Sequence, residues 1–250
     1  MNTIRFSPEV FARDITISPV YRSFDTEGFE QSAILPDLNS SQDLPGMRRE
    51  QLLARTDTPR TALVEVFPAP KSLLEAAVRY SEEDTDAGRA QAQEELVQVG
   101  LDVGGTYATN SAGLPGKLSA TTSPVSGLAP GLHFDGRDNL PLGQRIESRR
   151  RLGVNAGPGD RWLFVCIPDI MAMCDRLGVD DQKIPTPNDW QKFATTYLEE
   201  IDCIRIPVPA ESAYLLGTDI AVHEGSTLGA KDRSHAFFWL GHWTAGQFTD

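Results

Sequence analysis

Two residue types that bind metals stand close together in the segment GLHFDGRD, residues 131–138. His133 and Asp135 are separated by one residue, and side chains two apart in a β-strand point to the same face, roughly 6 to 7 Å apart. At a strand end, this imidazole and carboxylate can aim at one metal ion. The pair alone would equally suit a turn beside a surface histidine.

His223 is the best candidate for a third ligand. It ends the apolar run DIAVH, in which we expect Ala221 and His223 to share a face, and it precedes the polar segment EGSTLGAKD. Two histidines and one carboxylate on one side of ferrous iron leave three positions open to other molecules. The sequence therefore predicts an iron site formed by His133, Asp135 and His223.

Arg233 adds a candidate anion site. It opens the apolar run RSHAFFWL, in which Arg233, His235 and Trp239 would share one face of a strand. An arginine inside a small barrel is unfavourable unless an anion meets it, and a guanidinium grips a carboxylate with two parallel hydrogen bonds. A dicarboxylate held by Arg233 at one end and by the metal at the other would satisfy both groups.

The order His133-x-Asp135, His223 and then Arg233 resembles that of the iron(II)/2-oxoglutarate-dependent oxygenases over roughly residues 130–240. The resemblance implies a double-stranded β-helix, which is a jelly-roll or cupin-like core. It also implies Fe(II) on the three ligands and Arg233 on the distal carboxylate of 2-oxoglutarate. Many family members have serine two residues after this arginine, where the present chain has His235.

The resemblance implies a chemistry in which O₂ and 2-oxoglutarate yield succinate and CO₂ while hydrogen is removed from a substrate C–H bond. A narrower likeness is to the small oxygenases and radical halogenases of free amino acids. Those halogenases have glycine or alanine at the position of Asp135, so this chain favours hydroxylation. The expected substrate is a small polar metabolite, first of all an amino acid or a derivative in a biosynthetic pathway.

Other residues have two readings each. Asn155 could reach 2-oxoglutarate or serve the turn that follows it. Arg137 and Asp138 could bind a charged substrate or be solvated charges. Trp239 could line the substrate pocket or belong to the core. The triplet Arg149–Arg151 could bind phosphate, although protection of a strand edge fits an acidic chain better.

The surrounding elements indicate one α+β domain over residues 1–250, with a mostly helical part at 1–100 and the β-helix core at 101–250. Strands are expected at 61–68, on both sides of the hairpin turn GPGD (157–160) and through the last fifty residues. Helices are expected at 71–99, with a break near 84–88, and at 187–203. Loops at 36–48 and 104–130 would wall the pocket.

Composition limits the function classes. The net charge of −12 argues against a nucleic-acid partner, and no apolar run is long enough for a membrane span. The N-terminus lacks an apolar signal core, and three cysteines without ligand spacing fit reduced thiols, so we expect a cytoplasmic protein. The oligomeric state is left open.

Three other function classes remain. A cupin-type metalloenzyme without 2-oxoglutarate would use the same ligands but would not need Arg233. A jelly roll that serves only as a binding module would need no metal triad. A serine or cysteine hydrolase has little support, because the chain has no G-x-S-x-G motif and no cysteine placed beside a histidine.

Overall fold

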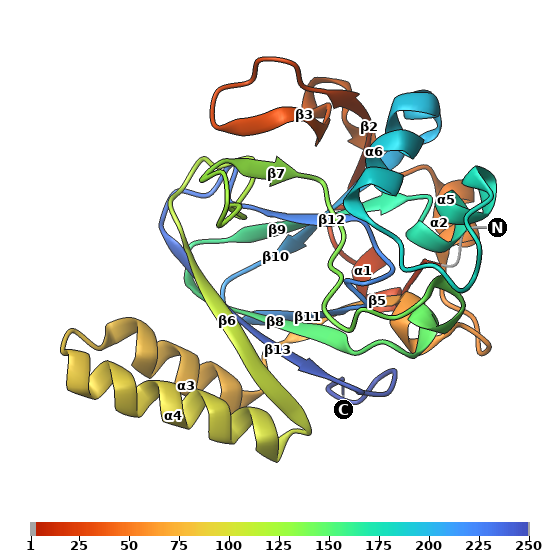
Figure 1. Cartoon of the computed structure of the whole chain (residues 1–250). Helices are drawn as coiled ribbons and strands as arrows, with labels where there is room; N and C mark the ends of the chain where they lie inside the picture. Colours follow the sequence, from red (N-terminus) through yellow and green to blue (C-terminus); the bar gives the residue numbers. More distant parts are fainter. Residues whose placement is uncertain (1–3, 250) are drawn as a thin grey trace.

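Two β-sheets face each other across a shared apolar core in the computed structural model, which describes residues 4–249 (Figure 1). The strand order of the first sheet is β1 (Arg5–Phe6), β5 (Leu63–Pro68), β11 (Ser212–Leu216), β8 (Arg150–Pro158), β13 (Ser234–Gly241) and β6 (Gly105–Gly113). The order of the second is β12 (His223–Ser226), β9 (Arg161–Ile167), β10 (Asp202–Val208), β2 (Thr16–Arg22), β3 (Phe29–Pro36) and β7 (Ala129–Gly131), with β4 (Gln42–Asp43) paired to β2.

The helices lie around these sheets. They are α1 (Pro8–Phe11), α2 (Gly46–Leu52), α3 (Lys71–Glu82), α4 (Asp86–Asp102), α5 (Ile170–Leu177) and α6 (Pro187–Thr196). Short 3₁₀ turns are η1 (Leu38–Ser40), η2 (Arg60–Ala62), η3 (Leu142–Glu147) and η4 (Leu198–Glu200). The protein is thus a mixed α+β fold with a jelly-roll-like core of two sheets, as the class predicted from sequence requires.

Strand β9 shows why the two sheets stay together. Its residues from Leu163 to Ile167 are all buried, and the apolar cluster that contains them also includes Val64 and Leu216 of the opposite sheet. A run buried on both faces has the continuous apolar sequence that this strand shows, LFVCI. Burial of such side chains from water is the main force that holds two sheets face to face.

The turn at residues 157–160 connects the two sheets. β8 ends at Pro158 and β9 begins at Arg161, as expected, but β8 pairs with β11 and β13 whereas β9 pairs with β10 and β12. The predicted β-hairpin is therefore wrong, although the predicted turn is correct. A tight turn with glycine at positive φ suits both connections, so its sequence cannot tell them apart.

Helices α3 and α4 form a hairpin on the outer side of the first sheet, at the lower left of Figure 1. They occur where the sequence predicts two helices, and the Thr85 side chain caps α4 by accepting a hydrogen bond from the Gly88 amide at 3.1 Å. A second apolar cluster joins Leu73 and Leu96 of these helices to Phe237 and Trp239 of β13. Both faces of β13 are therefore covered.

The prediction of a mostly helical segment at residues 1–100 holds for residues 71–100, where α3 and α4 lie, whereas the only α-helices among residues 4–70 are the short α1 and α2. The first 68 residues supply β1 to β5, which extend both sheets. This N-terminal segment contains short apolar stretches such as Ile34 and Leu35 at the buried end of β3, a strand that pairs with β2 on one side and with the distant β7 on the other. Local periodicity over so few residues does not reveal that pairing.

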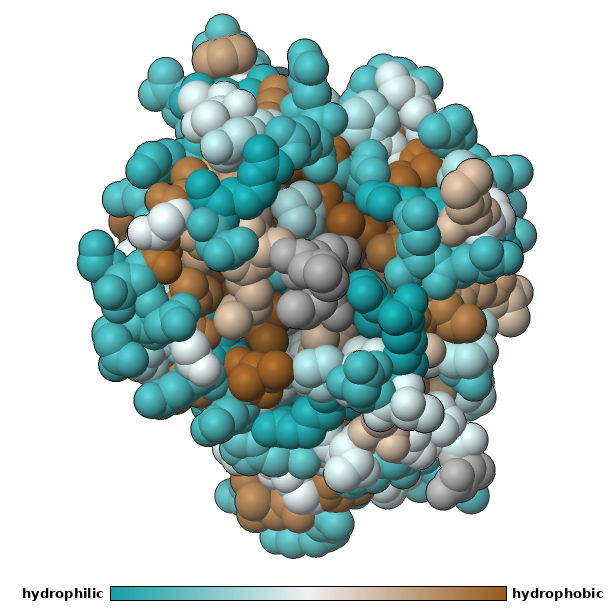
Figure 2. Space-filling model, turned by 90° about the vertical axis from the view of Figure 1, so that its right-hand side faces the viewer, coloured by the Kyte–Doolittle hydropathy of each residue, from teal (hydrophilic) through white to brown (hydrophobic). Residues whose placement is uncertain are grey.

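No helix within residues 4–249 is long and apolar enough to cross a membrane. Figure 2 shows the face that lies on the right of Figure 1, where hydrophilic side chains predominate and hydrophobic ones are scattered among them. All three cysteines are free and buried.

Candidate metal centre

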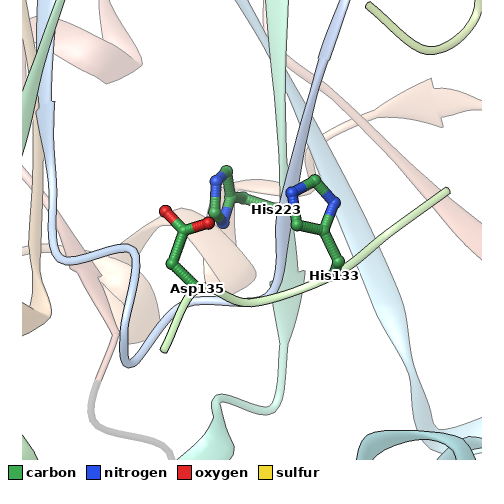
Figure 3. Close-up of side chains that lie close together, drawn as sticks. All are labelled: His133, Asp135 and His223. Atoms are coloured by element: carbon green, nitrogen blue, oxygen red, sulfur yellow. The ribbon is translucent and has the colours of Figure 1, made fainter. Parts of the chain in front are cut away.

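His133, Asp135 and His223 form one cluster, as the sequence predicts. One ligand atom from each lies within 4.8 Å of the others, and Figure 3 shows the three side chains pointing toward one another. His133 and His223 are paired by their backbones: the His133 amide donates to the His223 carbonyl at 3.1 Å and the reverse bond is 2.7 Å. Strand pairing, and not a bound ion, therefore sets the spacing of two candidate ligands.

Both imidazoles have the tautomer that a metal ligand needs. Nδ1 of His133 lies 2.8 Å from the Gly131 carbonyl oxygen, and Nδ1 of His223 lies 3.0 Å from that of Ala221. A carbonyl oxygen can only accept, so each Nδ1 carries the hydrogen and each Nε2 keeps its lone pair. Such a backbone contact is a common way to fix the orientation of a metal-binding histidine.

Arg151 contacts two of the three candidate ligands. Its guanidinium forms an ion pair with Asp135 Oδ2, and its Nη1 donates to His223 Nε2 at 3.2 Å. Burial disfavours the Asp135 carboxylate, but the charges of Arg151 and the two histidines hold its pKa well below the usual range. Burial, opposed by Asp135 and aided by His133, lowers the pKa of His223 to about 3. A neutral imidazole and an ionised carboxylate are the forms in which these residues bind a divalent metal, and both already contact the cationic Arg151.

Glu224 supports His133 from behind. Its side chain is buried, with Oε2 at 3.5 Å from His133 Nδ1 and Oε1 accepting hydrogen bonds from the Thr121 hydroxyl and the Gly225 amide, both at 2.8 Å. Burial disfavours the charged His133 ring, but the contact with Glu224 outweighs this effect and raises the pKa of His133. A carboxylate behind a histidine also strengthens it as a metal ligand.

The segment after the cluster is held in place by buried groups. The Asp219 carboxylate accepts hydrogen bonds from the amides of Arg137 and Asp138, both at 3.2 Å. The fully buried Arg145 donates to the Asp219 carbonyl at 2.6 Å and to the Asp135 carbonyl at 3.4 Å. The Asp135 backbone is therefore fixed from two sides, which positions its carboxylate.

A polar cavity of about 380 Å³ opens beside the three candidate ligands. The lining side chains come from both sheets and from the segment before β7; they are Thr109, Asn110, Ser111, Ala112, Ala120, Thr121, Thr122, His133, Asp135, Arg137, Arg151, Arg161, Tyr214, His223 and Phe238, together with Gly225. Residues 109–112 and 120–122 thus wall the cavity, as expected for the segment 104–130. The segment 36–48, which was also expected there, contributes none of these residues.

Arg161 is the buried cation of this cavity. It is only 6% exposed, and its Nη1 contacts the Ser234 hydroxyl at 3.2 Å and the Ser111 carbonyl at 3.4 Å. Within residues 4–249 it forms no ion pair with a carboxylate. Burial lowers its pKa, because a charge removed from water is disfavoured, and the attraction of Tyr214 and Glu224 offsets this effect only in part.

The expected cofactor-binding residues Arg233 and His235 do not reach the cavity. Arg233 is exposed and precedes β13, while His235 points outward to α3, where Nδ1 lies 2.8 Å from Ser81 Oγ. Trp239, an expected substrate contact, faces the same way and donates from Nε1 to the Leu96 carbonyl at 3.0 Å. His235 and Trp239 share one face of β13, as the sequence predicts, but the opposite face, which carries Phe238, looks into the cavity.

Two further candidate residues do not line the cavity, and local contacts explain where they lie. Asn155 is buried within the turn between β8 and β9, where its side chain donates to the carbonyls of Gly159 and Val208 and accepts from the Gly157 amide. Asp138, an expected substrate contact, binds Arg149 through the backbone amide and the guanidinium. Arg137, in contrast, lines the cavity as expected.

Arg151 and Arg161 are functional candidates that the sequence interpretation missed. The triplet Arg149–Arg151 was assigned to a strand edge, but β8 lies between β11 and β13. Arg149 pairs with Asp138, Arg150 with the buried Glu65, and Arg151 with Asp135. The sequence signal that could have identified Arg161 is a charged residue at the start of the apolar run WLFVCI. Arginine is almost never fully buried unless it has a partner.

No known protein family model matches this chain, and a search of curated proteins gives no significant match.

Proposed function

We propose that the protein is an Fe(II)- and 2-oxoglutarate-dependent oxygenase that oxidises a C–H bond of a small polar metabolite, with hydroxylation as the outcome. The observation that carries this proposal is the pairing of the His133–Asp135–His223 cluster with Arg161, a buried cation without an anionic partner, in one cavity. A cupin-type metalloenzyme without 2-oxoglutarate would have no use for that second group.

The arrangement of strands supports a double-stranded β-helix. From β8 onward the chain crosses between the sheets four times: β8 lies in the first sheet, β9 and β10 in the second, β11 in the first, β12 in the second and β13 in the first. The candidate ligands lie at β12 and at the bridge that His133 forms with it. Repeated crossing between two facing sheets is compatible with the double-stranded β-helix that the family resemblance implies for residues 130–240.

His133, Asp135 and His223 would hold the iron through Nε2 of the two imidazoles and a carboxylate oxygen. Arg151 would then release His223 Nε2 and keep Asp135, on which its guanidinium already lies. Arg161 and the Ser234 hydroxyl would bind the distal carboxylate of 2-oxoglutarate in place of Arg233. When bound, the iron and 2-oxoglutarate supply the activation of O₂ that removal of hydrogen from carbon requires.

Anaerobic titration of the protein with Fe(II) and 2-oxoglutarate tests the proposal through the visible charge-transfer band of the chelate. We expect a band with wild type and its loss in His223→Ala. Arg161→Gln should weaken 2-oxoglutarate binding by roughly tenfold or more, because a charged hydrogen bond is removed from a buried site. The matched control is Arg233→Gln, which should bind as wild type does.

Absence of the band with wild type would overturn the use of 2-oxoglutarate. Equal binding by Arg161→Gln and wild type would overturn the role of Arg161, and a loss in Arg233→Gln alone would restore the assignment made from sequence. A chloride-dependent chlorinated product would contradict hydroxylation.

A further inference from the structure

The cavity beside the candidate metal centre is strongly cationic in a protein that is strongly anionic. Three arginines line it, namely Arg137, Arg151 and Arg161, whereas Asp135 is its one acidic lining residue among residues 4–249. The whole chain has a net charge of −12. Chance placement of charges in such a chain would favour acidic walls, so the local excess of arginine points to an anionic ligand.

The proposed cofactors do not neutralise this excess. Three guanidinium groups and a divalent metal carry five positive charges, whereas Asp135, the adjacent Glu224 and the dianion of 2-oxoglutarate carry four negative ones, which leaves one positive charge uncompensated. Uncompensated charge in a partly buried cavity is unfavourable. A further anion is therefore the ligand that best completes the site.

Arg137 is the guanidinium placed to receive that anion. Its side chain is 44% exposed and lies at the cavity, with Nε 4.0 Å from Asp135 Oδ2. Its backbone amide donates to the Asp219 carboxylate, and the next residue, Asp138, is held by its ion pair with Arg149. The segment is thus ordered while the Arg137 guanidinium stays accessible from solvent, unlike Arg161, which is almost fully buried.

The remaining walls provide neutral polar groups. Thr109, Asn110, Ser111, Thr121 and Thr122 come from β6 and from the segment before β7. Among the described lining residues there is no carboxylate other than Asp135 to receive a substrate ammonium group. The volume of about 380 Å³ lies near the low end of the range of roughly 300 to 1,000 Å³ for ligand pockets, so the substrate is small.

We propose that the primary substrate is a small organic anion, carrying a carboxylate, phosphonate or phosphate group that Arg137 binds at the mouth of the cavity. This inference rests on the proposed function and narrows it, because a basic amino acid such as free lysine finds no partner for its side-chain ammonium. Thr and Asn side chains of the wall would hold the neutral part of the substrate.

The test uses the full-length protein loaded anaerobically with Fe(II) and 2-oxoglutarate, and it measures binding by thermal shift and by perturbation of the charge-transfer band. The probes share a three-carbon chain: propionate, propylphosphonate and propyl phosphate as anions, and propionamide and propylamine as the neutral and cationic counterparts. The three anions differ in their acidic group, so their ranking identifies which one the site prefers.

We expect at least one anion to bind and both counterparts to fail. Arg137→Gln should weaken anion binding roughly tenfold, and Arg137→Lys should restore part of it. Arg233→Gln, which removes an exposed arginine outside the cavity, should bind as wild type does. The band formed before any probe is added is recorded for each variant, so that anion binding is compared on protein loaded with Fe(II) and 2-oxoglutarate.

The inference is overturned if propionamide or propylamine binds as well as the anions, if no anion binds, or if Arg137→Gln keeps the affinity of wild type. In each of these cases an intact initial band leaves the proposed function standing. A missing initial band in wild type counts against the proposed function itself.

Discussion

At the scale of single residues, the candidate site depends on groups that fix its ligands as much as on the ligands. Carbonyl oxygens of Gly131 and Ala221 set the two tautomers, and Arg145 holds the Asp135 backbone. Glu224 adds a negative charge behind His133. None of these groups lines the cavity, so we expect their removal to weaken metal binding first.

Glu224→Gln tests this arrangement. The glutamine oxygen can still accept from Thr121 and Gly225, but the charge beside His133 is lost. We expect metal affinity to fall by about 10- to 100-fold, the usual effect of removing an outer partner of a ligand. Competition with a chromophoric chelator measures the metal affinity. The control is Glu82→Gln on the exposed side of α3, which should bind metal as wild type does. Unchanged affinity would contradict the support assigned to Glu224.

The cluster of candidate metal ligands was predictable because its sequence signal is local. His133 and Asp135 are two residues apart, and His223 stands at the border of an apolar and a polar segment. Their assignment did not require the correct local structure. A strand was expected to end at His223, whereas residues 217–222 form a turn and irregular backbone and β12 begins at His223. Residue type and order were enough.

Arg161, the candidate for binding the 2-oxoglutarate carboxylate, was not predictable in the same way. Alternation along RSHAFFWL separates two faces but does not say which one looks inward. In β13 both faces are buried, one against α3 and α4 and the other toward the cavity. The choice depends on the helical hairpin, whose docking partner no local pattern reveals. To predict that Arg161 enters the cavity, one would likewise have to know how the two sheets face each other.

At the scale of elements, the contact of α4 with β13 is close and specific. A Cβ at Gly100 would lie 2.4 Å from Trp239 Cδ1, whereas a Cβ at Gly88 would meet only the flexible, exposed carboxylate of Glu83. The Trp239 indole lies against the helix backbone, to which it donates a hydrogen bond at Leu96. Glycine at position 100 is therefore a packing requirement.

Gly100→Ala and Gly88→Ala form a matched pair within α4. We expect Gly100→Ala to lower the free energy of unfolding by about 1–3 kcal/mol through overpacking, despite the better helix propensity of alanine. Gly88→Ala should be neutral or stabilising by up to about 1 kcal/mol. Urea denaturation measures both. Equal effects of the two substitutions would show that the Trp239 indole does not limit the distance between α4 and β13.

At the scale of the whole molecule, the stability should depend on pH through buried neutral histidine. Burial and the charges of Arg161 and Arg233 lower the pKa of His235 from its ordinary value of 6.5 to about 4. Between these two values the unfolded chain binds a proton that the folded protein does not. Stability from this residue is therefore present above pH 6.5 and is lost as the pH falls toward 4.

His235→Gln isolates this contribution. Relative to the variant, the metal-free wild type should lose stability as the pH is lowered from about 6.5 to about 4, and the difference between the two should then level off. Urea denaturation across this range gives the free energies. A difference that does not change with pH would contradict the lowered pKa of His235, whatever the substitution does to packing with Ser81.

The reciprocal backbone bridge between His133 and His223 has a consequence for the order of events during synthesis. The two histidines belong to distant parts of the chain, and β12 is held in place by β9, so the ligands meet only after most of the polypeptide has left the ribosome. Iron capture would then occur late, on a nearly finished fold. A nascent or truncated chain that lacks β12 would offer a metal only two of the three candidate ligands, His133 and Asp135. Such a chain would bind metal weakly before folding is complete.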